Sequence, residues 1–244
     1  MVNEKPIYCN NCGTKVVGNY CHGCGQRALV QEVSFSETFN DLAAGLFSFE
    51  APFWKTLKLL FLNPGKIFRD YLNGKRKTYF KPVSFFILLT AIHLLIRSLL
   101  AYDPMGKVPQ RSDVTLSIFR EAGQFMVQNI NNILFIFVFT LSLFSKLFFY
   151  KKYRWAEYIA QSFYLVGIYI FLGTLNMFLV VLLDTGLQFL TMLVMLLYYL
   201  YAMASFFKEN LVLVIIKSFF AYIFGTLLYV ALGYGLSLII VYLR

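Results

Sequence analysis

The stretch PVSFFILLTAIHLLIRSLLA, residues 82–101, decides the class of fold, because it can cross a lipid bilayer as one helix. Crossing about 30 Å of hydrocarbon takes roughly 20 apolar residues. Four further apolar runs follow, near residues 132–150, 158–183, 187–207 and 211–243. A content of 59% hydrophobic residues exceeds that of ordinary globular proteins. The sequence therefore predicts an all-α polytopic membrane protein with about five transmembrane helices in residues 82–244.

The last run is longer than one crossing requires. We expect it to tilt, to begin as an interfacial helix near Lys217, or to bend at Gly225 or Gly233. The segment between the first two runs is mixed polar and cannot span. It predicts an amphipathic helix from about Asp113.

Residues 29–81, which precede the first span, predict amphipathic helices on the membrane surface. A capping-box pattern opens residues 34–48, and Asn63-Pro64 starts a helix that stops near Gly74. Aromatic residues alternate here with basic ones, and this pattern is typical of helices that lie on anionic headgroups. The residues that we expect to contact such headgroups are Lys55, Lys58, Lys66, Lys75, Arg76 and Lys77. The alternative is that these helices pack on the ends of the transmembrane bundle, and both arrangements can hold together.

The distribution of lysine and arginine predicts the orientation. If the N-terminus is cytoplasmic, 17 of the 22 basic residues fall on the inner side, which favours five crossings with the C-terminus outside. The same distribution explains the net charge of +10 without nucleic acid. Binding of nucleic acid remains a less favoured alternative, which steep weakening with salt would reveal.

Four cysteines form a C-x2-C-x8-C-x2-C pattern in residues 1–28: Cys9, Cys12, Cys21 and Cys24. In a reducing cytosol, paired C-x2-C elements are typical of metal ligands rather than of disulfides. We expect a structural zinc ion in a closed four-thiolate shell, with Gly13 and Gly25 in left-handed turns. A rubredoxin-like iron centre and a redox dithiol are the alternatives. His22 lies between ligands, and we expect it to be a bystander.

Two stretches carry a resemblance to a known family. GNYCHGCGQ (18–26) and TLKLLFLNPGKIFRDYLNGKRKTYFKP (56–82), followed by an apolar span, resemble a bacterial family of zinc-ribbon membrane proteins of unknown function, over residues 9–95. Its most specific part is Pro64-Gly65 through Asn73-Gly74-Lys75-Arg76. The resemblance implies a zinc ribbon and a bacterial cell (inner) membrane, and no activity. The five-span body is also similar in architecture to Yip1-type membrane proteins.

The predicted spans contain few ionisable groups, and these are candidates for function. His93 and Arg97 share one helix face, and Asn176 and Asp184 add polarity to the third span and the turn after it. The sequence carries no H-E-x-x-H, G-x-S-x-G, Walker or Rossmann motif, so we expect no enzyme.

Two functions fit these features. The first, which we favour, is a non-enzymatic membrane scaffold or assembly factor whose cytoplasmic zinc ribbon docks a protein partner, within a larger membrane complex. The second is a transporter or channel subunit for a small solute or ion, with a pathway through the intramembrane polar residues.

Overall fold

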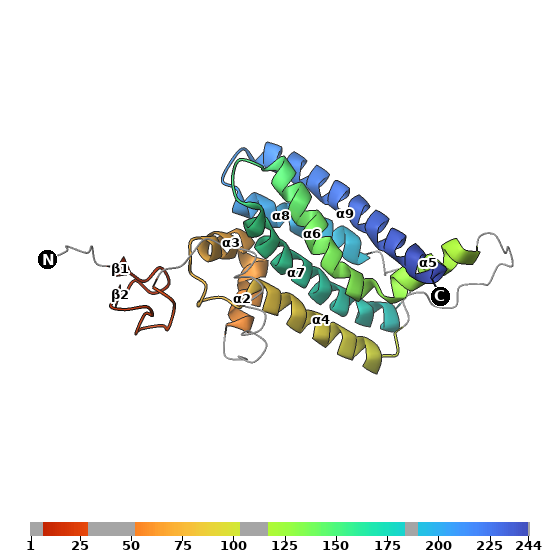
Figure 1. The fold of residues 1–244 in the computed structure, drawn as a ribbon, viewed down its shortest axis with the longest axis horizontal. Helices are drawn as coiled ribbons and strands as arrows, with labels where there is room; N and C mark the ends of the chain where they lie inside the picture. Colours follow the sequence, from red (N-terminus) through yellow and green to blue (C-terminus); the bar gives the residue numbers. More distant parts are fainter. Residues whose placement is uncertain (1–6, 29–51, 103–116, 184–189, 244) are drawn as a thin grey trace.

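The computed structural model describes residues 7–28, 52–102, 117–183 and 190–243. Within them, a small two-stranded sheet lies at the N-terminal end of a bundle of helices (Figure 1). The strands are β1 (Ile7–Tyr8) and β2 (Lys15–Val16), which pair antiparallel. The helices are α2 (Phe53–Leu62), α3 (Pro64–Leu72), α4 (Pro82–Leu99), α5 (Ser117–Gln128), α6 (Ile130–Phe148), α7 (Trp155–Leu182), α8 (Leu190–Phe206) and α9 (Leu211–Tyr242).

Each of the five predicted spans corresponds to one helix whose bounds lie within three residues of those expected. In the described parts, α4, α7 and α9 are long and apolar enough to cross a membrane, and α5 with α6 makes a fourth candidate, bent by 86°. Helix α8 has 17 residues and is about 26 Å long at about 1.5 Å per residue. The structure therefore supports a membrane protein with three to four candidate spans, fewer than the five expected.

Helix α7 is the centre of the bundle. Half of its most apolar window is buried, compared with 33% for α4 and 28% for α9. It packs against α4, α6 and α8, while α9 packs against α5, α6 and α8. Its buried aromatic side chains include Phe163 and Tyr164, which contact rings of α4, and Tyr158, which contacts the ring of Tyr153 in the preceding loop.

Helix α9 is one continuous helix of 32 residues, and its glycines lie within it. Gly225 and Gly233 are buried, and a Cβ added at Gly233 would approach Ile133 to 2.9 Å. These glycines therefore permit close packing of α9 against α6 without ending the helix. Many large apolar side chains of α9 point away from the bundle, as expected for a surface in contact with lipid.

One end of the bundle gathers basic segments that are far apart in the sequence. The rings of Phe149 and Phe207 stack with centroids 4.2 Å apart, which joins the loop after α6 to the end of α8. Lys152 forms an ion pair with Glu209, and the amine of Lys217 lies 5.7 Å from the ring of Phe149. Since α3 also contacts the end of α8, we call this side the basic end.

The helices before the first span lie at the basic end and are packed on it. The buried face of α2 consists of Thr56, Leu57 and Leu60. The predicted start of α3 is confirmed, because the side chain of Asn63 accepts a hydrogen bond from the N–H of Lys66 (3.1 Å) and Pro64 occupies the first helical position. The amphipathic helix predicted from about Asp113 is observed as α5. The helix predicted at 34–48 lies outside the described residues.

Candidate metal centre and its seat on the membrane-proximal helices

The four cysteine sulfur atoms form one cluster, with all Sγ atoms within 4.8 Å of one another. The Sγ atoms of Cys9 and Cys24 are 3.6 Å apart, and those of Cys12 and Cys21 are 3.5 Å apart. A disulfide requires about 2.05 Å. A tetrahedron with metal–sulfur bonds of about 2.3 Å has edges of about 3.8 Å. The donor set therefore fits a four-coordinate metal ion.

Two knuckles of equal backbone geometry position the thiols. In each, the glycine N–H donates to the carbonyl of the first cysteine, and that cysteine's N–H donates to a carbonyl beyond the glycine. The bonds are Gly13 N to Cys9 O (2.8 Å), Cys9 N to Thr14 O (2.9 Å), Gly25 N to Cys21 O (2.8 Å) and Cys21 N to Gln26 O (2.7 Å). The glycine φ angles are 76° and 70°, which confirms the predicted left-handed turns.

The electrostatics of the cluster favour a bound cation. Hydrogen bonds from Thr14, whose hydroxyl lies 3.2 Å from the sulfur of Cys12, lower the pKa of Cys12 to about 6. Loss of hydration raises the pKa of Cys24 to about 11. Thiols this close cannot all be negative unless a positive charge lies between them. His22 is exposed, and the ligand group found among the described residues consists of the four cysteines.

Gln26, the last residue of the second knuckle, fastens the four-cysteine domain to residues 73–78, which we call the basic loop. Its side-chain nitrogen donates to the carbonyl of Gly74 (2.8 Å), and its side-chain oxygen accepts from the N–H of Lys77 (3.2 Å). The Gln26 side chain is 7% exposed. Loss of buried hydrogen bonds of this kind lowers the stability of the fold, because both partners would be left without hydration.

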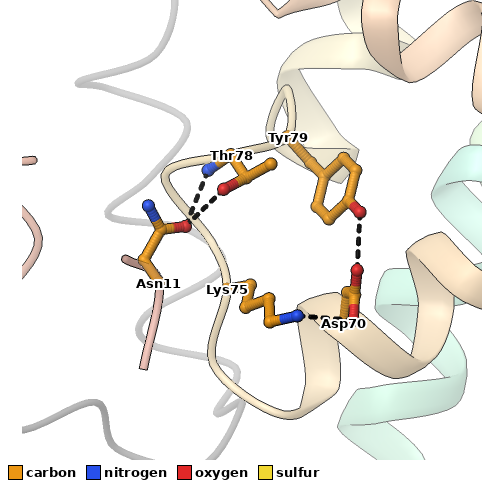
Figure 2. A network of polar contacts seen from close by, with 5 residues as sticks. All are labelled: Asn11, Asp70, Lys75, Thr78 and Tyr79. Atoms are coloured by element: carbon orange, nitrogen blue, oxygen red, sulfur yellow. Dashed lines mark hydrogen bonds and ion pairs between the residues drawn. The ribbon is translucent and has the colours of Figure 1, made fainter. Parts of the chain in front are cut away.

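Asn11, inside the first knuckle, makes a second attachment to the basic loop (Figure 2). Its side-chain oxygen accepts from both the N–H (3.1 Å) and the hydroxyl (2.6 Å) of Thr78. One residue from each knuckle thus holds the same loop. We call the two attachments together the seat of the metal-binding domain.

The basic loop is in turn held by Asp70 of α3. Its carboxylate accepts from the Tyr79 hydroxyl (2.7 Å) and pairs with the Lys75 amine (3.2 Å), as Figure 2 shows. Burial opposes ionisation of Asp70, yet the bonds from Tyr79 and Lys75 keep its pKa below the ordinary value. Burial and the bond to Asp70 raise the pKa of Tyr79, which therefore stays a donor. The charge of Asp70 fixes the shape of the loop.

Helix α3 is locked against the end of α8. The guanidinium of Arg69 donates to the carbonyls of Ser205 (2.6 Å) and Phe206 (2.8 Å), which are free acceptors at a helix C-terminus. A Cβ added at Gly65 would lie 2.1 Å from the carbonyl oxygen of Ser205. Gly65 of the Pro64-Gly65 motif therefore allows α3 to approach the end of α8 closely.

The six basic residues expected at lipid headgroups do not behave alike. Lys55, Lys58, Lys66 and Lys77 are exposed. Lys75 is paired with Asp70, and the guanidinium of Arg76 lies 5.7 Å from the centre of the Tyr71 ring. Part of the predicted lipid-binding set is therefore engaged in intramolecular contacts.

The intramembrane polar candidates meet in one cavity of about 120 Å³, which His93, Arg97 and Asn176 line. The Nδ1 atom of His93 lies 2.8 Å from the hydroxyl of Thr174. Arg97 donates to the carbonyl of Gln128 (3.0 Å), so its charge lies towards the end opposite the basic end. Asp184, the fourth candidate, lies outside the described residues.

Sequence reasoning missed the residues of the seat and of the contact between Arg69 and the end of α8, which we call the lock. Asn11, Gln26 and Arg69 lie beside recognised motifs, but side chains of these types are common on surfaces. Their partners are backbone groups and the Thr78 hydroxyl, up to 137 residues away in the chain. No spacing rule predicts such pairs.

Comparison with known proteins gives one match. Residues 50–94 match a family described as a protein of unknown function, DUF3667. The matched segment contains α2, α3, the basic loop and most of α4, and thus the loop side of the seat and the Arg69 side of the lock, but not Asn11, Gln26 or the end of α8. No curated protein and no solved structure matches the chain. The expected likeness to Yip1-type proteins and the bacterial origin stay predictions.

Proposed function

We propose that the chain is a non-enzymatic membrane scaffold or assembly factor, in which a structural zinc ribbon docks a protein partner beside the bilayer. The observation that carries this proposal is the seat: Asn11 and Gln26 fix the ribbon to the basic loop on one side. The large side chains of Tyr8, Val17 and Tyr20 are 59%, 83% and 56% exposed. A rigid domain with exposed aromatic and aliphatic groups is suited to contacting another protein.

Zinc is the proposed metal because four thiolates close its tetrahedral shell. A closed shell leaves no coordination position for a substrate, which supports a structural rather than a catalytic role. The small buried core of the ribbon, Cys9, Val16 and Cys21, is too small to hold a fold alone. Metal binding would therefore supply most of its folding free energy.

The proposed location is a bacterial inner membrane, with five crossings, a cytoplasmic N-terminus and the C-terminus outside. The basic end supports this orientation, because Lys152, Lys217 and the helix α3 meet there. Positive residues concentrate on the cytoplasmic side of membrane proteins. Helix α8 would be a short fourth span whose end is completed by Arg69.

Site-specific crosslinking in native membranes tests the proposal. A photoreactive residue at position 20 should capture one defined protein, identified by mass spectrometry. The double variant Cys9→Ser/Cys24→Ser should abolish capture while membrane insertion is retained, and His22→Ala, at an exposed non-ligand position, should preserve it. Unchanged capture by the cysteine variant would contradict the proposal.

The cavity beside His93 favours a second candidate function, a small-solute or ion transporter or channel subunit. It brings together three of the four predicted polar residues, at a place where α4 and α7 adjoin. This function predicts flux in reconstituted vesicles that falls in His93→Ala and in Asp184→Asn. Absence of flux across a broad panel of ions and solutes would count against it.

A further inference from the structure

A groove of about 670 Å³ runs from the basic loop down the side of α4, outside the metal centre and the polar cavity. The part beside the basic loop, which we call the upper part, is lined by Lys55, Lys77 and Thr78. The part along α4, which we call the lower part, is lined by Leu88 and Ile92. We infer that this groove binds one anionic phospholipid, with the headgroup at the two lysines and an acyl chain along α4. The inference does not depend on the proposed protein partner.

The charge at the upper part of the groove fits a phosphate-bearing headgroup. Lys55 and Lys77 are both exposed, and none of the nine described lining residues is acidic. The amine of Lys55 lies 6.0 Å from the centre of the ring of Tyr79, the residue that directly follows the basic loop. Two lysines converging from separate segments, α2 and the basic loop, can bind one anion between them.

The lower part of the groove fits an acyl chain. Leu88 and Ile92 are four residues apart and share one face of α4. They lie about 9 Å and about 15 Å beyond Pro82, where the candidate span begins, at about 1.5 Å per residue. Ile92 is 37% exposed at that depth, where hydrocarbon surrounds a spanning helix. A molecule occupying the whole groove needs both a charged end and a long apolar part.

The wall between the two parts is built of aromatic rings. The ring of Phe53 makes edge contacts with Trp54 (5.3 Å) and with Phe80 (5.8 Å). Trp54 is 76% exposed at the groove, and tryptophan favours the boundary between headgroups and acyl chains. A peptide or nucleic acid would match the lysines but not the apolar part at membrane depth, so a phospholipid is the occupant that both parts favour.

Quenching of Trp54 fluorescence by brominated lipids tests the inference. The chain has two tryptophans, so the variant Trp155→Phe leaves Trp54 as the single reporter. In phosphatidylcholine vesicles, brominated phosphatidylglycerol should quench Trp54 at a mole fraction roughly 25-fold lower than brominated phosphatidylcholine, since each lysine contributes about a fivefold preference.

Matched charge variants distinguish a specific lipid-binding site from general electrostatic attraction between anionic lipid and the basic protein surface. Lys55→Ala/Lys77→Ala should remove the preference, while Lys58→Ala/Lys66→Ala should keep it, because Lys58 and Lys66 are equally exposed but do not line the groove. Metal content of both variants verifies that the ribbon is folded. Equal losses in the two variants would overturn the inference. So would lack of Trp54 quenching by either lipid, as expected if residues 34–48 of the chain or a second copy filled the groove.

Discussion

The side-chain amide of Gln26 donates a 2.8 Å hydrogen bond to the carbonyl of Gly74, 48 residues further along the chain. This bond joins the second knuckle of the ribbon to the basic loop, which precedes the first span, so that the two form one continuous surface. The loop therefore holds the ribbon through backbone groups and the Thr78 hydroxyl, while the side chain of Lys77 is exposed to solvent.

Breaking the seat should expose the basic loop. In Gln26→Ala, two hydrogen bonds to the loop are lost. Each contributes about 1 kcal/mol, so the loss of each raises the fraction of molecules with a detached loop roughly fivefold. Trypsin should therefore cleave at Lys75–Lys77 at least about fivefold faster, as measured by mass spectrometry of digested membranes. His22→Ala, which changes an exposed neighbour, should cleave like the wild type. An unchanged rate in Gln26→Ala would show that the seat does not protect the loop.

The cysteine cluster should hold one metal ion per chain. Elemental analysis of purified protein should give close to one zinc, falling to near zero in Cys9→Ser/Cys24→Ser, because two of four ligands are lost. His22→Ala should retain the metal. Iron in place of zinc would contradict the metal assignment and leave the ligand set intact. Chelation should also open the basic loop to trypsin, because the knuckles that carry Asn11 and Gln26 unfold.

Loss of the Asp70 carboxylate should loosen the basic loop in a pH-dependent manner. Asp70→Ala removes the acceptor of Tyr79 and the partner of Lys75, of which the buried Tyr79 bond matters more because Lys75 is 43% exposed. The pKa of Asp70 is depressed in the folded protein, so its contribution is complete above the unfolded value of about 3.9 and lost as pH falls through the folded value.

Hydrogen exchange at residues 73–78 is the measurement for Asp70. The wild type should be protected more than Asp70→Ala by a constant factor from pH 5 to pH 8, a range that lies between the ordinary Asp pKa of about 3.9 and the ordinary Lys pKa of about 10.4. The difference should shrink below about pH 4. Asp70→Asn, which keeps an acceptor for Tyr79, should lie between the two. A difference that grows towards acid would contradict the role of the carboxylate.

Helix α3 should not tolerate a side chain at its contact with α8. In Gly65→Ala, the new Cβ would lie 2.1 Å from the carbonyl oxygen of Ser205, so the helices must separate at a cost of about 1–3 kcal/mol. The melting temperature in detergent should fall by roughly 2–10 °C. Gly235→Ala is the matched control: no atom lies within 4 Å of its added Cβ, and alanine favours a helix. Equal melting temperatures would contradict the close approach.

The sequence predicted the helices well because their signal is local. A run of apolar residues such as 82–101 needs only its length and composition to be recognised, and α4 begins at the residue expected. The clustering of the four cysteines could be predicted equally well, because four cysteines with this spacing in one short segment are typical of a metal site. The bends and ends were harder: α6 follows α5 at 86°, and no composition rule gives such an angle.

The seat could not be predicted, because basic residues near a span are ordinarily assigned to lipid. Lys75 matched that pattern and is paired with Asp70, five residues earlier. The sequence leaves open whether the amphipathic helices pack on the bundle, and the buried face of α2 supports such packing. Lys55 and Lys58 of the same helix are exposed, so their contact with headgroups stays a prediction.

The contact between Arg69 and the end of α8 also has a consequence for biogenesis. Arg69 leaves the ribosome 136 residues before the Ser205 carbonyl that it binds, an interval of about 7–27 s at about 5–20 residues per second. During that time α3 lacks its docking site on α8, although the segment that carries α3 has already reached the bilayer. The lock therefore closes only after α8 has been synthesised, and it can close before α9, which follows α8 in the chain, takes its place in the bundle.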